Sequence, residues 1–321
     1  MTAAATTPQS GGAAPSVRAD RLAGVVLGVG NLASTRTFYE RIFRDASGTW
    51  QERHGRLRFC CGAQTIEFVQ RARPRTLPDS GQHQAYRVPR ARFGPLVQEL
   101  QVQGSTIDWW REDHPAEREV TAYLHDPSGN RVQLVASDQL DPLLDHIAME
   151  IHMFDYCEYL YVTALGGRVD YYYGWRTLDH EEARLWASGD DPCAPWTRRD
   201  NPSYRDFLVE DPTTGELRPA RFSDQLGVER PPARPRVPRP NGQVFLSYGD
   251  TRVVLISATK VRQEPPEEQT RGTPRLVFHT DQSADKAAAH LASFPFRHRR
   301  EGRHIFVRDP DGNFAELVCH R

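Results

Sequence analysis

One ten-residue motif occurs twice in this chain. The sequence HDPSGNRVQL at residues 125–134 returns as RDPDGNFAEL at residues 308–317. Each copy contains Asp-Pro-x-Gly-Asn, which predicts a tight turn, because proline suits the second position and Gly or Asn tolerates the positive φ that closes it. The strand that leaves each turn points alternate side chains to one face, so Gln133 and Glu316 occupy matching positions. The chain is therefore expected to be a repeat in which one copy ends on a neutral amide and the other on a carboxylate.

The bulk composition is typical of a globular cytoplasmic protein without a nucleic-acid or membrane partner. The 321 residues suffice for two domains, and their net charge is only −1. No apolar run reaches the length of a membrane span, and the N-terminus lacks the apolar core of a signal peptide. The odd number of cysteines, without a C-x-x-C pair, predicts free thiols in a reducing compartment. The sequence is also compatible with a homodimer. The cysteines are Cys60, Cys61, Cys157, Cys193 and Cys319.

The order strand, helix, strands recurs four times along the chain. An internal repeat is a stronger fold signal than any single propensity. It predicts an α+β fold of two tandem modules, at residues 21–138 and 143–321, each made of paired βαβββ units that form an open, barrel-like mixed sheet. The opening strands are expected at Val25–Val29, Gln84–Val88, His146–Ile151 and Arg275–Thr280, and the helices at Leu32–Phe43, Phe93–Val102, Tyr156–Leu165 and Ala284–Phe294.

Two segments fall outside the repeat. Residues 1–20 are rich in Ala, Thr, Gly, Ser and Pro without periodicity, which predicts a disordered tail. Residues 176–240 have no counterpart in the first half, contain Trp186 and Trp196, and end in a Pro/Arg run. Such an insertion is either a lid over a site or a packed surface excursion, and the sequence leaves both open.

The strand-helix openings and the doubled turn resemble the vicinal oxygen chelate superfamily, which includes glyoxalases, bleomycin and fosfomycin resistance proteins and extradiol dioxygenases. The resemblance covers residues 22–136 and 144–320, apart from the insertion. It implies barrel modules around a cleft, but it does not fix the reaction, because one fold hosts several chemistries. The openings that carry it are Val25–Val29 before Phe38 and Tyr39, and His146–Met149 before Leu160 and Tyr161.

The resemblance also implies a divalent metal, held by a His on the first strand of a module, a His on the fifth and a Glu on the eighth. On this pattern the first module retains one ligand of three and the second retains two. The second module is therefore expected to be active and the first to be structural. In strand order, the residues are Gly24, His83 and Gln133 in the first module, and His146, Arg275 and Glu316 in the second.

Strand alternation offers a replacement for the ligand that Arg275 displaces. If Arg275 faces the cleft, Val277 and His279 face it as well, and His279 lies four residues further along the strand. His146, His279 and Glu316 would form the two-imidazole, one-carboxylate triad that suits non-haem Fe(II) or Mn(II), with His304 as the alternative imidazole. We therefore predict a metal site at His146, His279 and Glu316. The opposing interpretation is an ion pair between Arg275 and Glu316, which would leave no metal at all.

The remaining residues on this face are predicted to handle substrate. His304 is expected to act as an acid or base, and Arg275 to pair with an anionic substrate group. Glu150, Phe306 and Tyr173 are expected to line the substrate site. Phe306 stands where the extradiol enzymes have a tyrosine, which puts ring cleavage in doubt.

The leading hypothesis is a dioxygenase-like oxidoreductase that acts on a small aromatic or oxygen-chelating metabolite. Fe(II) is preferred as its metal, with Mn(II), Ni(II) and Zn(II) as the other candidates. Two other functions stay open. One is a metal-dependent isomerase or lyase, and the other is a metal-free protein that sequesters a small molecule, as some resistance proteins do.

Overall fold

The structure is a computed structural model that describes residues 17–72, 81–109, 121–151, 157–177, 208–210, 217–219, 236–257, 275–294, 296–309 and 311–320. Most of the predicted tail and most of the 176–240 insertion lie outside these residues. Within the described ranges, two strands of the insertion, β11 (Leu208–Glu210) and β12 (Leu217–Pro219), pair with each other.

The four predicted βαβββ units are present in chain order. The third unit departs from the others, because a short π-helix takes the place of the helix predicted over Tyr156–Leu165. Unit 1 contains β1 (Arg21–Val29), α1 (Leu32–Ile42), β2 (Gly48–Arg53), β3 (Arg56–Cys61) and β4 (Gln64–Gln70). Unit 2 contains β5 (His83–Pro89), α2 (Arg90–Val102), β6 (Asp108–Trp109), β7 (Thr121–His125) and β8 (Arg131–Ser137). Unit 3 contains β9 (Leu144–Ile151), η1 (Tyr159–Ala164), β10 (Arg168–Thr177), β13 (Arg236–Tyr248) and β14 (Thr251–Ser257). Unit 4 contains β15 (Arg275–Thr280), α7 (Ala284–Ala292), β16 (His298–Glu301), β17 (His304–Arg308) and β18 (Phe314–Cys319).

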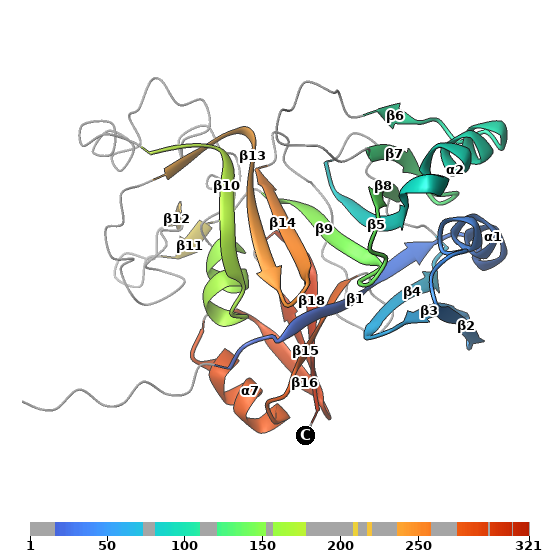
Figure 1. Ribbon diagram of the computed structural model, residues 1–321. Helices are drawn as coiled ribbons and strands as arrows, with labels where there is room; N and C mark the ends of the chain where they lie inside the picture. The colour runs from blue at the N-terminus through green and yellow to red at the C-terminus, as the bar shows by residue number, and fades with distance from the viewer. Residues whose placement is uncertain are drawn as a thin grey trace, which may run out of the picture.

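Two eight-stranded sheets each combine two of the units, but not the pairs that the sequence predicted. Sheet A has the order β16-β17-β18-β15-β1-β4-β3-β2, so unit 4 continues into unit 1 (Figure 1). Sheet B has the order β10-β13-β14-β9-β5-β8-β7-β6, so unit 3 continues into unit 2. Both junctions, β1 with β15 and β5 with β9, are antiparallel. Each sheet is therefore built from two units, one from each predicted module.

The open mixed sheets confirm the α+β fold class. The segments 21–138 and 143–321, however, do not each form a sheet of their own. The prediction placed units 1 and 2 in one sheet and units 3 and 4 in the other. In the structure, sheets form between units 1 and 4 and between units 2 and 3. The reason is physical: all four opening strands carry an apolar face of the same period, so the sequence pattern does not specify which two meet.

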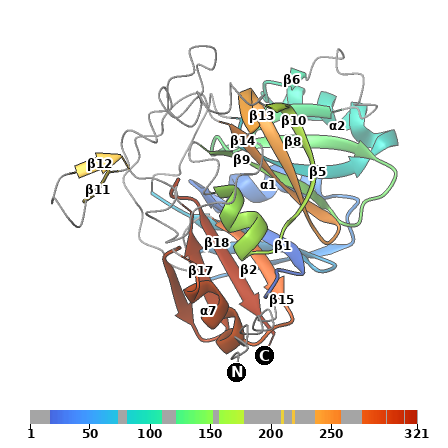
Figure 2. The ribbon, with the colours of Figure 1, turned by 90° about the vertical axis from the view of Figure 1, so that its left-hand side faces the viewer.

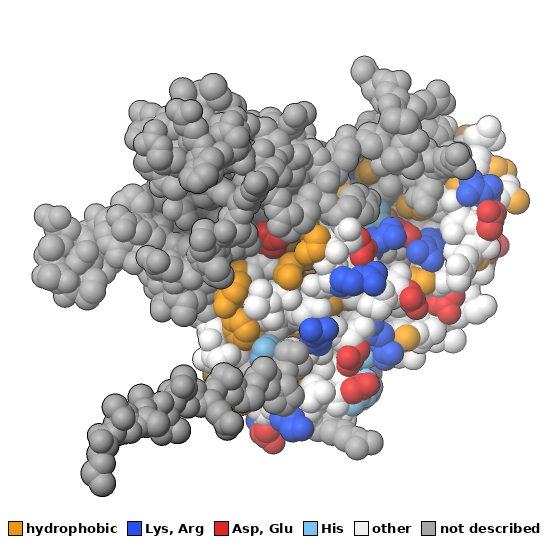
Figure 3. All heavy atoms as spheres, turned by 60° about the vertical axis from the view of Figure 1, so that its left-hand side comes forward, with side chains coloured by type: hydrophobic (Ala, Val, Ile, Leu, Met, Phe, Trp, Pro, Cys, Tyr) orange, Lys and Arg blue, Asp and Glu red, His pale blue; other side chains and the backbone are white. Residues whose placement is uncertain are grey.

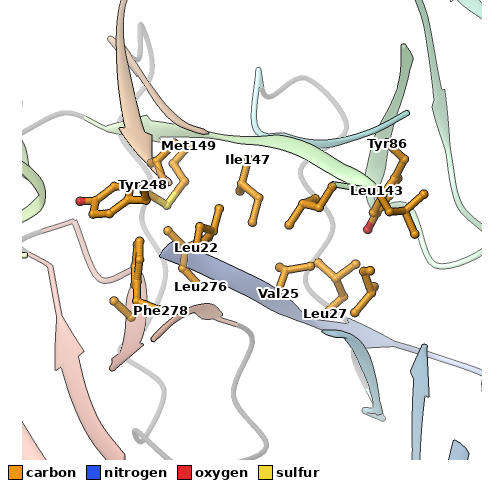
Figure 4. Close-up of a cluster of buried hydrophobic side chains, with 14 of the residues drawn as sticks. Leu22, Val25, Leu27, Tyr86, Leu143, Ile147, Met149, Tyr248, Leu276 and Phe278 are labelled. Carbon is orange, nitrogen blue, oxygen red and sulfur yellow. The ribbon is translucent and has the colours of Figure 1, made fainter. Parts of the chain in front are cut away.

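The hydrophobic core lies between the two sheets. Val25 and Leu27 of β1, with Phe278 of β15, face Ile147 and Met149 of β9 across the interface (Figure 4). All five are at most 9% exposed. The alternate residues on these strands point to the opposite side of each sheet, which we call the outer face. Residues at functional positions of the repeat lie on the outer faces.

The repeated turns tie consecutive units together. Gly129 and Gly312 have φ values of 84° and 87°, which is the positive φ that the motif predicts. In the first turn Tyr39 of α1 donates a hydrogen bond to Asp126 (3.2 Å), and in the second Tyr161 of η1 donates to Asp309 (3.3 Å). Each turn is thus fixed to the helical segment of the preceding unit, although the two belong to different sheets.

The helices pack on the same pattern. In α1, Asn31 caps the N-terminus by accepting a hydrogen bond from the Ser34 backbone N–H (2.9 Å). Arg92 of α2 forms an ion pair with Asp45, just beyond α1 (2.8 Å). On the other side of the molecule, α7 lies against β17 and β18 (Figure 2), and its His290 bonds the Ala164 carbonyl oxygen of η1 (3.0 Å). The helical segment of unit 1 therefore packs with that of unit 2, and the helical segment of unit 3 with that of unit 4.

Three bulk features agree with the composition. No helix of the described residues is long and apolar enough to cross a membrane. Lys, Arg, Asp and Glu side chains are interspersed over the coloured part of the face in Figure 3. The four cysteines among the described residues are free thiols, as expected: Cys60, Cys61, Cys157 and Cys319.

Candidate metal centre

The outer face of sheet B brings together the side chains of His83, His146 and Gln133, which we call the donor group. Strand β5 lies between β9 and β8, and Ala85 at its centre is in register with His146 on one side and Gln133 on the other. His83 is two residues from Ala85 and points to the same face. The Nε2 atoms of His83 and His146 lie 3.1 Å apart. Three positions from two predicted modules thus meet in one place.

Both imidazoles are held by their other nitrogen. The Nδ1 of His83 faces the Gly81 carbonyl oxygen (2.6 Å), and the Nδ1 of His146 faces the Asp145 carboxylate (2.8 Å). Because a carbonyl or carboxylate oxygen can only accept, both Nδ1 atoms carry the proton. An imidazole that is neutral with its proton on Nδ1 has its lone pair on Nε2, and the two Nε2 atoms face one another at 3.1 Å. Acceptors bound to the remote nitrogen are the usual partners of metal-ligating histidines.

A β-bulge creates the support for His146. The register between β5 and β9 shifts so that Ala85 faces His146 while Tyr86 faces Leu144, which leaves Asp145 as the extra residue. Asp145 also accepts a hydrogen bond from Arg87 (2.7 Å). Burial raises the pKa of Asp145, but the hydrogen bonds from His146 and Arg87 and the charge of Arg87 outweigh it and hold that pKa well below its ordinary value. Asp145 is therefore a permanent carboxylate at pH 7.

His83 is kept neutral by its surroundings. Burial, reinforced by the neighbouring His146, lowers the pKa of His83 to about 3. A protonated His83 is therefore not available at pH 7 to donate a hydrogen bond to His146. If both rings are neutral, two nitrogen lone pairs face each other, which is repulsive, and either a proton on His146 Nε2 or a metal ion between the rings removes that repulsion.

The donor group fits a divalent metal. Two nitrogens bound to one ion at ~2.0–2.1 Å with a tetrahedral angle are separated by about 3.3 Å, close to the 3.1 Å between the Nε2 atoms. Gln133 lies beside His83, and its Oε1 is buried without a hydrogen-bond partner. Within the described residues no three His, Cys, Asp or Glu side chains are grouped to hold a metal. The third donor of this group is an amide oxygen, which mixed imidazole and oxygen sites accept.

The rest of this face combines an apolar patch with one acid. Ala148, Val254, Ile256 and Phe245 form a small hydrophobic cluster separate from the main core. Glu150, two positions from Ala148 on β9, accepts a hydrogen bond from the Gly81 backbone N–H. Because the Gly81 carbonyl oxygen in turn fixes His83, Glu150 supports the donor group through a single residue, Gly81. The face can therefore bind a molecule that is partly apolar.

On the outer face of sheet A, by contrast, the charged side chains form ion pairs with one another. Arg275 of β15 binds Glu316 of β18 (Nε–Oε2, 2.5 Å), and His304 of β17 binds the other oxygen of that carboxylate (2.5 Å). Glu67 of β4 is held by Arg56 (2.9 Å) and Arg58 (2.7 Å). Both carboxylates are buried and both are neutralised by the chain itself.

The predicted triad of His146, His279 and Glu316 is not assembled. His146 lies in sheet B, whereas His279 and Glu316 lie in sheet A. His279 contacts Arg21 (3.2 Å), and burial lowers its pKa to about 4. The opposing interpretation, an ion pair between Arg275 and Glu316, is what the structure shows. The positions in the repeat were assigned correctly, but units 3 and 4 do not share a sheet.

The other predicted site residues are divided between the two faces. His304 and Phe306 belong to the Arg275–Glu316 network, and the Arg275 guanidinium lies 5.4 Å from the Phe306 ring centre. Glu150 belongs to the donor-group face. The backbone of Tyr173 pairs with that of Gln243 at the edge of sheet B, and its side chain lies outside the described part. The sequence identified His83 and Gln133 as ligand positions but not as partners of His146.

Comparisons with known proteins support the fold. No protein-family model matches the chain, and no curated protein sequence matches it. Among solved structures, glyoxalase I from Zea mays is similar with a TM-score of 0.56 and 14% identity, over 93% of this chain and 92% of that one. A protein from Bacillus subtilis, provisionally assigned as a dioxygenase, is similar with a TM-score of 0.52 and 12% identity, over 95% and 86%. The chain therefore shares the fold of these solved structures.

Proposed function

We propose that this protein is a metal-dependent enzyme whose active centre is the donor group on sheet B. The observation that carries the proposal is the pair of Nε2 atoms 3.1 Å apart, with both Nδ1 atoms already bound to acceptors. With both rings neutral their two lone pairs face each other, and a metal ion between them would bind both. His83, His146 and the Gln133 amide oxygen would hold it.

The metal would act as a Lewis acid toward oxygen atoms of a bound substrate. All three protein donors are neutral, so they leave the positive charge of a divalent ion uncompensated. That charge favours an anionic or readily ionised ligand, such as a small molecule with two adjacent oxygens. The apolar cluster around Val254 would bind the carbon skeleton of that molecule.

The reaction class is proposed on the same basis. A dioxygenase-like oxidation with Fe(II) is the leading candidate, and an isomerase or lyase reaction with Mn(II), Ni(II) or Zn(II) is the alternative. The fold supports both, because it is shared with a glyoxalase and with the provisionally assigned dioxygenase. Oxygen consumption by the Fe(II)-loaded protein with catechols, compared with the Zn(II)-loaded protein, separates the two classes.

Metal analysis tests the proposal directly. The purified protein, stripped with a chelator and reloaded, is expected to bind one equivalent of Fe(II), Mn(II), Ni(II) or Zn(II) by elemental analysis. His83→Ala and His146→Ala should abolish this uptake, whereas the matched control His279→Ala in sheet A should retain it. Equal uptake by His146→Ala and by the unmodified chain would refute the site. A protein that takes up no metal but binds aromatic ligands would instead be the metal-free binding protein, which the neutral Gln133 favours.

A further inference from the structure

A second group of side chains adjoins the donor group on sheet B. On the antiparallel strands β7 and β8, Tyr123 is in register with Gln133, and His125 with Arg131. The two pairs are two residues apart along each strand, so all four side chains point to the outer face. We call this group the β7–β8 quartet. It shares Gln133 with the donor group.

The quartet is linked to the donor group by ring contacts. The Arg131 guanidinium lies 4.6 Å from the centre of the Tyr123 ring, which meets the His83 ring edge-on with centres 5.2 Å apart. A single aromatic ring therefore separates a cation from the donor group. The strands place this cation at the end of the face where the Asp126 turn begins.

Two buried polar atoms in the quartet have no hydrogen-bond partner. They are Nε2 of His125 and Oε1 of Gln133. A buried polar atom without a partner costs about 1–3 kcal/mol, so native proteins retain one where a ligand, ion or water satisfies it. The donor group accounts for Gln133. A second group on the ligand, beyond the atoms that a metal would bind, would satisfy Nε2 of His125.

Sheet A shows how this fold holds an anion with the same two residue types. There an arginine and a histidine, Arg275 and His304, hold the carboxylate of Glu316 at 2.5 Å each. In sheet B the residue at the Glu316 position is the neutral Gln133. The chain therefore supplies an internal carboxylate on one face and a neutral amide on the other.

We propose that His125 and Arg131 bind the anionic end of the ligand, a carboxylate or a phosphate group. Arg131 supplies the charge, and Nε2 of His125 donates a hydrogen bond to one oxygen. The inference deepens the proposed function, on which it rests, by assigning the substrate class: a small oxyanion whose adjacent oxygens reach the donor group. Tyr123 separates the two ends of that ligand.

Anion titration of the metal-free protein tests this inference. Inorganic phosphate and succinate are added separately to chelator-stripped protein while the ring-proton NMR signal of His125 is followed. We expect at least one of the two to shift this signal saturably, and its identity distinguishes a phosphate from a carboxylate. Arg131→Gln should weaken binding by roughly tenfold or more. The control Arg308→Gln, an arginine on β17 of sheet A at the place that His125 has on β7, should leave binding unchanged.

The outcomes separate this inference from the metal proposal. No saturable shift with either anion, or equal weakening by Arg131→Gln and Arg308→Gln, would overturn the anion site. Arg131→Lys keeps the charge, so it should retain most of the anion binding. Circular dichroism of Arg131→Gln checks that its loss of binding is not a loss of folding. Because the titration uses metal-free protein, anion binding without metal uptake would refute the metal centre alone.

Discussion

The two outer faces use the same positions of the repeat for opposite purposes. On sheet A the charged groups satisfy one another, since Arg275 and His304 neutralise Glu316. On sheet B the Nε2 atoms of His83 and His146 face one another 3.1 Å apart beside the neutral Gln133. This difference is the basis on which we propose a structural role for the outer face of sheet A and a ligand site on that of sheet B. The counterparts are Arg275 and His83, Glu316 and Gln133, and Gly24 and His146.

The backbone reinforces this difference at the first strand. A Cβ atom placed on Gly24 would lie 1.9 Å from the Thr65 carbonyl oxygen of β4. No side chain fits there, so the absence of a ligand in sheet A follows from the packing of β1 against β4. Sheet A could not regain a metal site through position 24 without separating these strands.

The largest expected effect comes from breaking the ion pair of sheet A. Arg275→Met leaves the Glu316 carboxylate buried with His304 as its remaining partner, which should lower the free energy of unfolding by about 3–5 kcal/mol in urea titrations. The double variant Arg275→Met/Glu316→Leu removes both charges and should recover most of this loss. A single variant that loses less than ~1 kcal/mol would show that the pair does not hold sheet A together.

The next effect concerns Gly24. Gly24→Ala forces a methyl group against the Thr65 carbonyl oxygen and should cost about 1–3 kcal/mol of unfolding free energy in the same measurement. Gly94 in α2 is a matched control, because nothing lies within 4 Å of a Cβ there. Because Pro95 follows it, Gly94→Ala gains no clear stability from reduced chain entropy, and it should change the free energy of unfolding by less than ~1 kcal/mol. A Gly24→Ala variant with an unchanged free energy of unfolding would mean that β1 and β4 can move apart.

The sequence predicted the fold and the equivalent positions of the repeat, but not which units share a sheet; the ligand roles stay a prediction. The doubled turn and the four opening strands were sufficient for the α+β repeat, because turn chemistry and apolar period are local properties. His83, Gln133 and His146 stood at ligand positions, yet His146 was combined with Glu316. Which unit pairs with which depends on contacts between strands whose patterns are equivalent, so no local signal distinguishes the alternatives.

A smaller effect would sharpen the contrast at the donor group. Gln133→Glu gives sheet B the carboxylate that sheet A has in Glu316. In sheet B this carboxylate would lie next to two imidazoles, and His83 stands where sheet A has Arg275. It should tighten binding of Mn(II) or Zn(II) by roughly tenfold in calorimetric titrations, because the added Coulomb attraction exceeds the cost of burying the charge. Gln51→Glu, on the exposed β2 strand, controls for net charge. Unchanged affinity in Gln133→Glu would place the amide outside the metal site.

The two turns differ in one residue that affects stability. Asp126 is followed by Ser128, whose N–H donates to it (2.8 Å), while the matching residue after Asp309 is the acid Asp311. Burial first, and the charge of Asp311 second, raise the pKa of Asp309 to about 7. Asp311 also faces the Cys157 thiol (3.5 Å), so both acids lie against the start of the unit 3 helical segment.

The smallest expected effect therefore depends on pH. The folded pKa of Asp309 lies above its ordinary value, so its contribution to stability is complete below about pH 4 and is lost as pH rises through 7. Asp311→Ser, which copies Ser128, should lower that pKa and add about 1 kcal/mol to the free energy of unfolding at pH 8, with little change at pH 4. Ser128→Asp should do the reverse in the first turn. Urea titrations at both pH values decide this, and an equal gain at pH 4 and pH 8 would exclude Asp309 as the titrating group.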